Sequence, residues 1–132
     1  MKRLILIPLI ALGAHAAHAQ GVLSSGTPIT PINSTALEAS HIITAGPGSL
    51  ASLTITDTTA EYILIMNSAT LPANGAVTLL FPPIKVGANT TTMVVFPNPL
   101  RASAGITVCN SSTGTFTKTI GGSTCIFSAQ LQ

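Results

Sequence analysis

Residues 61–81, EYILIMNSATLPANGAVTLLF, combine a dense apolar run with the clearest turn signal of the chain. The run at 62–66 is too short for a buried helix of ordinary length, and the run at 76–81 stops at Pro82 and Pro83. Between them lie Pro72, which fixes φ, and the pair Asn74-Gly75, which tolerates positive φ. The stretch therefore predicts a β-hairpin with arms at 62–66 and 76–81.

The first arm is apolar on both of its faces. Because side chains alternate along a strand, Tyr62, Leu64 and Met66 share one face, whereas Ile63 and Ile65 share the other. A strand with two apolar faces is covered on both sides. We expect a second sheet to form one cover, and either a loop of the same chain or another subunit to form the other.

The chain from residue 36 onward continues in short apolar runs. Residues 50–57 alternate, with Leu53 and Ile55 on one face and polar residues on the other, and further strands are expected at 36–45, 90–96, 105–110, 115–119 and 123–131. About seven or eight strands, spaced by roughly ten residues with turn signals between them, predict a single all-β antiparallel β-sandwich, jelly-roll or immunoglobulin-like, over 36–132. Its core is expected to contain Leu53, Ile55, Tyr62, Leu64, Met66, Val77, Leu79, Val94, Phe96, Ile106, Val108 and Phe127.

The first residues have the features of a secretory signal peptide. Lys2 and Arg3 precede an apolar run at 4–12 and a small-residue stretch, and we expect cleavage after Ala19. The apolar run is well short of the roughly 20 residues of a membrane-spanning helix, although an uncleaved anchor is the alternative. Residues 20–35 contain Pro28 and Pro31 and predict an extended arm or linker, lying on a neighbour or free as a tail. The sequence thus predicts export to the periplasm or the extracellular space, without stable membrane insertion.

The charge balance of the chain depends on that segment. Of five basic residues, Lys2 and Arg3 lie within it, so three remain against three acidic residues, and 132 − 19 = 113 residues form one domain. A balanced charge gives no support to nucleic-acid binding and removes the repulsion that keeps copies apart. We therefore expect a homo-oligomer or a subunit of a larger particle.

Few residues could perform chemistry. His41 is the single histidine after residue 19, no Gly-x-Ser-x-Gly motif occurs, and a lone histidine lacks the nucleophile and orienting group that a catalytic base needs. Asp57 and Glu61 flank a short loop and are expected to be solvated strand ends rather than a calcium site or a glycosidase pair. We expect no enzyme, no cofactor and no metal site.

Cys109 and Cys125 are an even pair, and in an exported chain such a pair predicts a disulfide. Strand alternation places Cys125 on the face of Phe127, but Cys109 on the face opposite Val108. The bridge therefore requires a bulge, or positions at strand ends.

The stretch from Ala39 onward resembles small β-sandwich structural proteins of tailed bacteriophages. The similar features are Gly-Ser-Leu at 48–50, the turn NSATLPANG at 67–75, VGANT at 86–90, and the passage from FPNP at 96–99 to AGITV at 104–108. The resemblance implies a virion decoration, neck or fibre-associated protein without catalytic residues. A secretory signal would be out of place in a particle assembled in the cytoplasm.

The predicted function is therefore a non-enzymatic structural or attachment subunit. We expect self-association through Ile63 and Ile65, because these residues form the second apolar face of the 62–66 strand. The alternative is an exported bacterial surface subunit of pilus or adhesin type, which would explain the signal and the cysteine pair. A soluble carbohydrate-binding module is a weaker alternative, because the chain has no tryptophan to form an aromatic platform.

Overall fold

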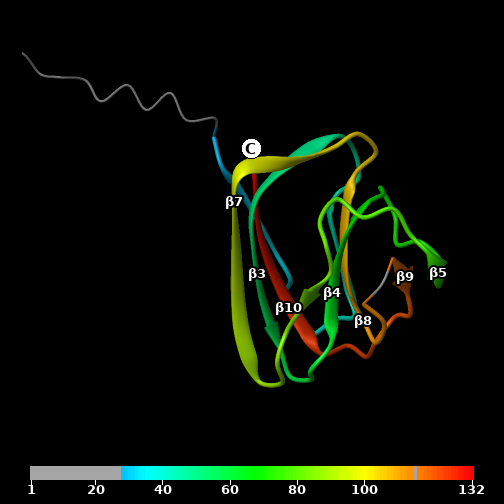
Figure 1. Ribbon diagram of the computed structural model, residues 1–132. Helices are drawn as coiled ribbons and strands as arrows, with labels where there is room; N and C mark the ends of the chain where they lie inside the picture. Colours follow the sequence, from blue (N-terminus) through cyan, green and yellow to red (C-terminus); the bar gives the residue numbers. More distant parts are fainter. Residues whose placement is uncertain (1–27, 115) are drawn as a thin grey trace, which may run out of the picture.

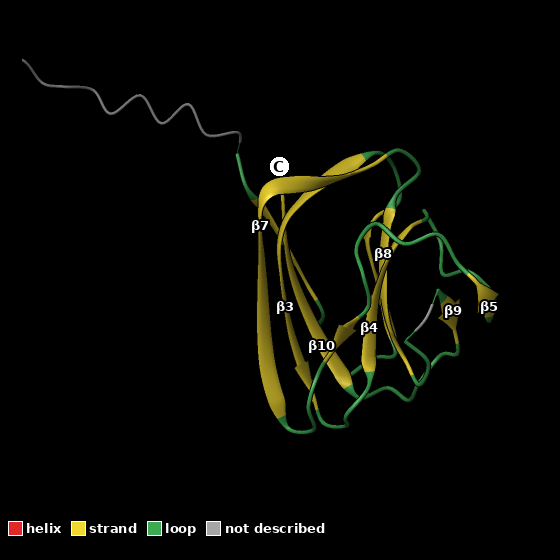
Figure 2. Cartoon of the chain, viewed as in Figure 1, coloured by secondary structure: helices red, strands yellow, loops and turns green. Residues whose placement is uncertain are grey.

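The computed structural model describes residues 28–114 and 116–132, which form strands and loops and no helix (Figure 2). The predicted signal peptide at 1–19 and the first part of the predicted arm lie outside the described residues. The strands are β1 (Thr30–Asn33), β2 (Ser40–Thr44), β3 (Gly48–Asp57), β4 (Tyr62–Asn67), β5 (Gly75–Ala76), β6 (Ile84–Lys85), β7 (Thr90–Ala102), β8 (Ile106–Ser111), β9 (Thr117–Lys118) and β10 (Cys125–Leu131).

The strands form three antiparallel layers (Figure 1). Sheet A has the order β1-β10-β3-β7, sheet B has the order β2-β8-β4-β6, and the small sheet C pairs β5 with β9. Sheets A and B pack face to face, and sheet C lies on the far side of sheet B (Figure 1). The predicted all-β sandwich is confirmed.

The main core lies between sheets A and B. Leu53 and Ile55 of β3 face inward and are fully buried, as the alternation of residues 50–57 predicts. The buried hydrophobic residues of this core are Ile43, Leu50, Leu53, Ile55, Ile63, Ile65, Val86, Phe96, Ala102, Ile106, Val108, Cys125, Phe127 and Ala129.

A second, smaller core lies on the outer face of sheet B. Leu64 and Met66 of β4 and Cys109 of β8 are fully buried there. They are covered by half-buried hydrophobic side chains of the same chain: Val77, Leu79 and Ile120. The second cover of β4 is therefore a segment of its own chain, which decides between the two alternatives left open by the sequence.

The predicted hairpin forms only in part. The chain leaves β4 for sheet C, where β5 pairs with β9, and then returns antiparallel along β4. The return pairs Leu79 with Met66 as an isolated bridge, and β6 pairs with the start of β4. Pro82 and Pro83 separate these two contacts, because proline has no N–H to give to the ladder. The arm at 76–81 is thus a broken strand rather than a continuous one.

The predicted end of a strand at residue 96 is also wrong, since β7 continues to Ala102. Val95 pairs with Ser52 and Leu100 pairs with Leu50, so the four residues 96–99 lie opposite Ala51 alone. This bulge accommodates Pro97 and Pro99, which could not donate hydrogen bonds to β3. In the sequence these prolines predict the end of a strand, whereas in the structure they mark a bend within one long strand.

Part of the predicted arm belongs to the domain itself. Residues 30–33 form β1, which pairs with β10 at the edge of sheet A, from Thr30 opposite Leu131 to Asn33 opposite Ser128. The chain then crosses to sheet B near Glu38, which forms a bridge with Cys125. These described residues lie on their own sheet, so they are not an arm that extends to a neighbour.

Replacing Leu64 with alanine tests the second core. Because Leu64 is fully buried under residues of the 68–82 and 112–124 segments, Leu64→Ala should lower the free energy of unfolding by about 2 to 5 kcal/mol. Urea denaturation measures the change, and Leu71→Ala is the control, because Leu71 is 38% exposed and its loss should change stability by about 0.5 kcal/mol or less. Equal, small effects of the two substitutions would contradict the covered outer face of β4.

Candidate functional site

The two residues predicted to mediate self-association are not on the surface. Ile63 and Ile65 are 0% and 1% exposed, and both belong to the main core between the sheets. That prediction is wrong, because this face of β4 points toward sheet A. The opposite face of β4 is also covered, so β4 presents no free apolar surface to a partner.

The two cysteines are free thiols, and the predicted disulfide does not form in this structure. Cys109 faces the second core on the outer side of sheet B, whereas Cys125 faces the main core on its inner side. Sheet B therefore lies between the two side chains. Burial raises the pKa of Cys109 to about 11 and that of Cys125 to about 12, so neither is a reactive thiolate near neutral pH.

His41 lies in a contact that resembles a catalytic triad in composition but not in order. Its Nδ1 lies 2.8 Å from Glu38 Oε1, and Ser34 Oγ donates to the same carboxylate oxygen. In a triad the histidine must contact the hydroxyl whose proton it removes. Here the carboxylate lies between Ser34 and His41, so the arrangement orders the crossing from β1 to β2 and does not activate a nucleophile.

Asp57 and Glu61 lie together at one end of the sandwich. Asp57 is fully buried, and its Oδ1 accepts hydrogen bonds from the backbone N–H of Thr59 at 2.9 Å and from its hydroxyl at 3.3 Å. Three buried oxygens have no donor among the described residues: Asp57 Oδ2, Glu61 Oε2 and Asn110 Oδ1. Neither carboxylate is the freely solvated strand end that the sequence suggested.

The environment of Glu61 makes its carboxyl group harder to ionise. Burial, and then the neighbouring Asp57 carboxylate, raise the pKa of Glu61. Its carboxyl group packs closely over Gly121, so a side chain at this turn would displace the carboxyl group of Glu61. Among residues 28–114 and 116–132 no three His, Cys, Asp or Glu side chains cluster as metal ligands. With its raised pKa, Glu61 is a weaker acid than a fully solvated glutamate.

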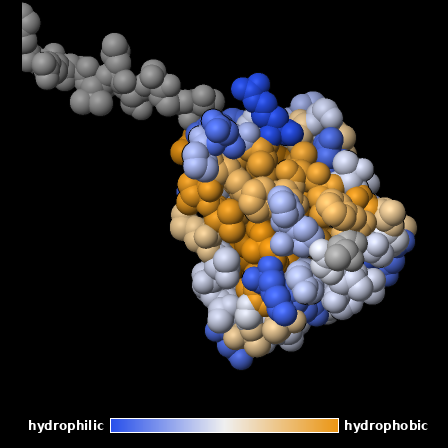
Figure 3. All heavy atoms as spheres, in the orientation of Figure 1, coloured by the Kyte–Doolittle hydropathy of each residue, from blue (hydrophilic) through white to orange (hydrophobic). Residues whose placement is uncertain are grey.

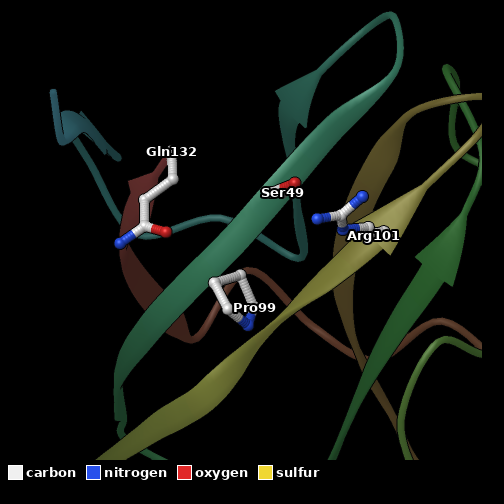
Figure 4. A pocket seen from close by; sticks show the side chains of 4 residues that line it. All are labelled: Ser49, Pro99, Arg101 and Gln132. Atoms are coloured by element: carbon white, nitrogen blue, oxygen red, sulfur yellow. The ribbon is translucent and has the colours of Figure 1, made fainter. Parts of the chain in front are cut away.

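A pocket of about 330 Å³ lies where β3 and β7 bend together, and it is lined by Ser49, Pro99, Arg101 and Gln132 (Figure 4). Arg101 and Ser49 lie on neighbouring strands, and Gln132 follows β10 on the other side of β3 (Figure 4). The four lining side chains are polar or proline, and Arg101 is the charged one among them.

The most distinctive surface is β7, an edge strand of sheet A. Its side chains Met93 and Val95 are 62% and 60% exposed, and no residue from Thr90 to Leu100 is charged. Figure 3 shows hydrophobic side chains gathered over β7 and over the side of the sandwich between β7 and β4. The rings of Phe81 and Phe96 meet edge to face, with centroids 5.2 Å apart, and Phe96 belongs to the main core.

The other edges are shorter or protected. β1 and β2 have four and five residues, and β6 has two residues that follow a Pro-Pro pair. Proteins usually protect edge strands with charge, proline, bulges or short length. In β7 the bulge and the prolines protect only the part after Phe96, so residues 90–96 form an unprotected edge that sequence reasoning missed. The uncharged sequence TTTMVVF was its signal.

Comparison with protein-family models, with curated proteins and with solved structures found no match. Within the described part of the chain, no helix is long and apolar enough to cross a membrane.

Replacing Glu61 with glutamine tests the carboxyl pair. The pKa of Glu61 in the folded state is raised above the ordinary value of 4.5. Protonated Glu61 therefore contributes stability that is fully present below pH 4.5 and is lost as the pH rises through the raised pKa. Near neutral pH, Glu61→Gln should therefore increase the free energy of unfolding, because the amide removes a charge beside Asp57. Below pH 4.5 the variant and the parent protein should have similar stability.

Urea denaturation at the two pH values measures this difference. Glu38→Gln is the matched control, because it removes a carboxylate that faces His41 rather than another carboxylate, and it should not stabilise the protein. A Glu61→Gln variant that is less stable than the parent near neutral pH would contradict the assignment.

Proposed function

We propose that the protein is a non-enzymatic structural subunit that joins a second copy of itself through the free edge of β7. The observation that carries this proposal is the unprotected edge at residues 90–96 with Met93 and Val95 exposed beside it. Unpaired N–H and C=O groups of such an edge are a template for pairing with another strand. Pairing would satisfy these groups and place the side chains of the added strand beside Met93 and Val95 on the same face of the sheet.

The absence of charge from Thr90 to Leu100 favours pairing of β7 with its own copy. In an antiparallel pair around a two-fold axis, each strand meets an identical one, and like charges directly opposite would destabilise the pair. A strand of Thr, Met, Val and Phe has no such repulsion. Sheet A would then continue across the interface into the second copy.

Two observations bear on the particle that such a subunit would build. The resemblance of the sequence to phage structural proteins favours a virion-associated decoration or fibre-type protein. The predicted signal peptide favours instead an exported subunit of a bacterial surface assembly. In both assignments the subunit would associate through the same edge of β7.

Lysine substitutions at the edge test the proposal. Met93→Lys combined with Val95→Lys should convert the assembled protein into monomers, because charges on an edge strand oppose strand addition. Size exclusion with light scattering measures the mass. Since both side chains are exposed, the double variant should keep its fold, with a stability change of about 0.5 kcal/mol per site or less.

Ile42→Lys is the matched control, because Ile42 is 47% exposed on β2, another edge strand, and its replacement should leave the assembly intact. Assembly that persists in the double variant would contradict the proposal, as would a parent protein that stays monomeric at high concentration.

A further inference from the structure

Lys118 of β9 is buried in an unusual way. It is 2% exposed, and among the described residues no carboxylate lies within ion-pair distance of it. Lysine is almost never fully buried unless it is paired, because removing an ammonium from water is costly. Its Nζ instead donates a hydrogen bond of 2.7 Å to the side-chain amide oxygen of Asn74. A neutral amide is a weak partner for a buried charge.

The amide of Asn74 is held in a fixed position against this amine. Its Oδ1 also accepts a 3.1 Å hydrogen bond from the backbone N–H of Ile120. β5 lies beside β9 (Figure 1). Their pairing places Gly75 directly opposite Lys118, so Asn74 is held beside it. The amide carbon is one covalent bond beyond the oxygen that the amine touches. The nucleophilic nitrogen therefore lies next to a carbonyl group that two donors polarise.

We propose that Lys118 and Asn74 join in an intramolecular amide cross-link, with release of ammonia. The lone pair of Nζ attacks Cγ of Asn74 and forms a new C–N bond, and the bond between Cγ and Nδ2 breaks. The amine reacts in its neutral form, and the N–H proton that it loses on forming the new bond moves to the departing nitrogen, which leaves as ammonia. The step consumes no oxidant and no cofactor, since an amine and a primary amide give a secondary amide and ammonia.

The surroundings supply the factors that such a reaction needs. The fold holds the two reacting groups side by side, so the reaction does not incur the entropy cost of bringing them together. Lys118 is 2% exposed and lies close enough to Cys109 of the second core to influence that thiol, so the protein shields the amine from bulk water. The N–H of Ile120 points at the oxygen on which negative charge develops.

The cross-link would reinforce a weak part of the fold. β5 and β9 have two residues each, and a two-stranded ladder of this size is marginal alone. These strands belong to the segments that cover the outer face of sheet B. A covalent bond between Asn74 and Lys118 would fix the cover over Leu64 and Met66, which goes beyond the assembly proposed for β7.

Mass spectrometry of the purified full chain tests the proposal. The intact mass should be lower than the sequence requires by one ammonia, and digestion should release a branched peptide that contains Asn74 and Lys118. Asn74→Ala should restore the full mass, and because Asn74 is exposed this variant should fold. Lys118→Met should restore it as well, whereas Lys85→Met, at an exposed lysine, should retain the loss of ammonia.

Two results would overturn the cross-link. The first is folded protein with its full sequence mass. The second is a loss of ammonia that maps to a cyclic imide of Asn74 with Gly75, without Lys118 in a branched peptide, since an Asn-Gly pair can close on itself. If Lys118→Met fails to fold, the Asn74→Ala variant and the peptide map still decide between these outcomes.

Discussion

Burial of both faces of the central strands of sheet B is the constraint on which the rest of the structure depends. Every residue of β8 is buried, and β4 is buried from Ile63 to Met66. Sheet A covers one face, so the chain must provide a second cover, and the segments around β5 and β9 do so. The positions of Asn74, Lys118 and the Gly121 turn follow from this requirement.

Because both faces of the central strands of sheet B are covered, these faces are not available to bind a ligand or a partner. Several titratable groups are held in contacts within the fold: two buried thiols, a histidine beside a glutamate, and a carboxyl pair at one end of the sandwich. Sheet B has short edges, whereas sheet A ends in the long strand β7. The edge of β7 is uncharged over residues 90–96 and has Met93 and Val95 exposed, which is typical of an edge to which another strand can be added.

Local alternation in the sequence predicted the faces of β3 and β4, and hence the all-β sandwich, because side chains of a strand must point alternately to opposite sides. It could not decide which apolar face of β4 meets the second sheet, so Ile63 and Ile65 were assigned to a partner although they belong to the main core. The partner of β5 could not be predicted, because a two-residue ladder between segments about forty residues apart leaves no periodic pattern. Pro97 and Pro99 predict the end of a strand for a related reason. Whether a bulge can accommodate them within a longer strand depends on the opposite strand, which local sequence does not specify.

Residue-resolved hydrogen exchange of the assembled and monomeric fractions tests the central claim most directly. If β7 is the joining edge, alternate amides within residues 90–96, those that point away from β3, should exchange more slowly in the assembled fraction, while the edge amides of β2 should not change. Unchanged exchange along β7, with protection gained on another surface, would contradict the account.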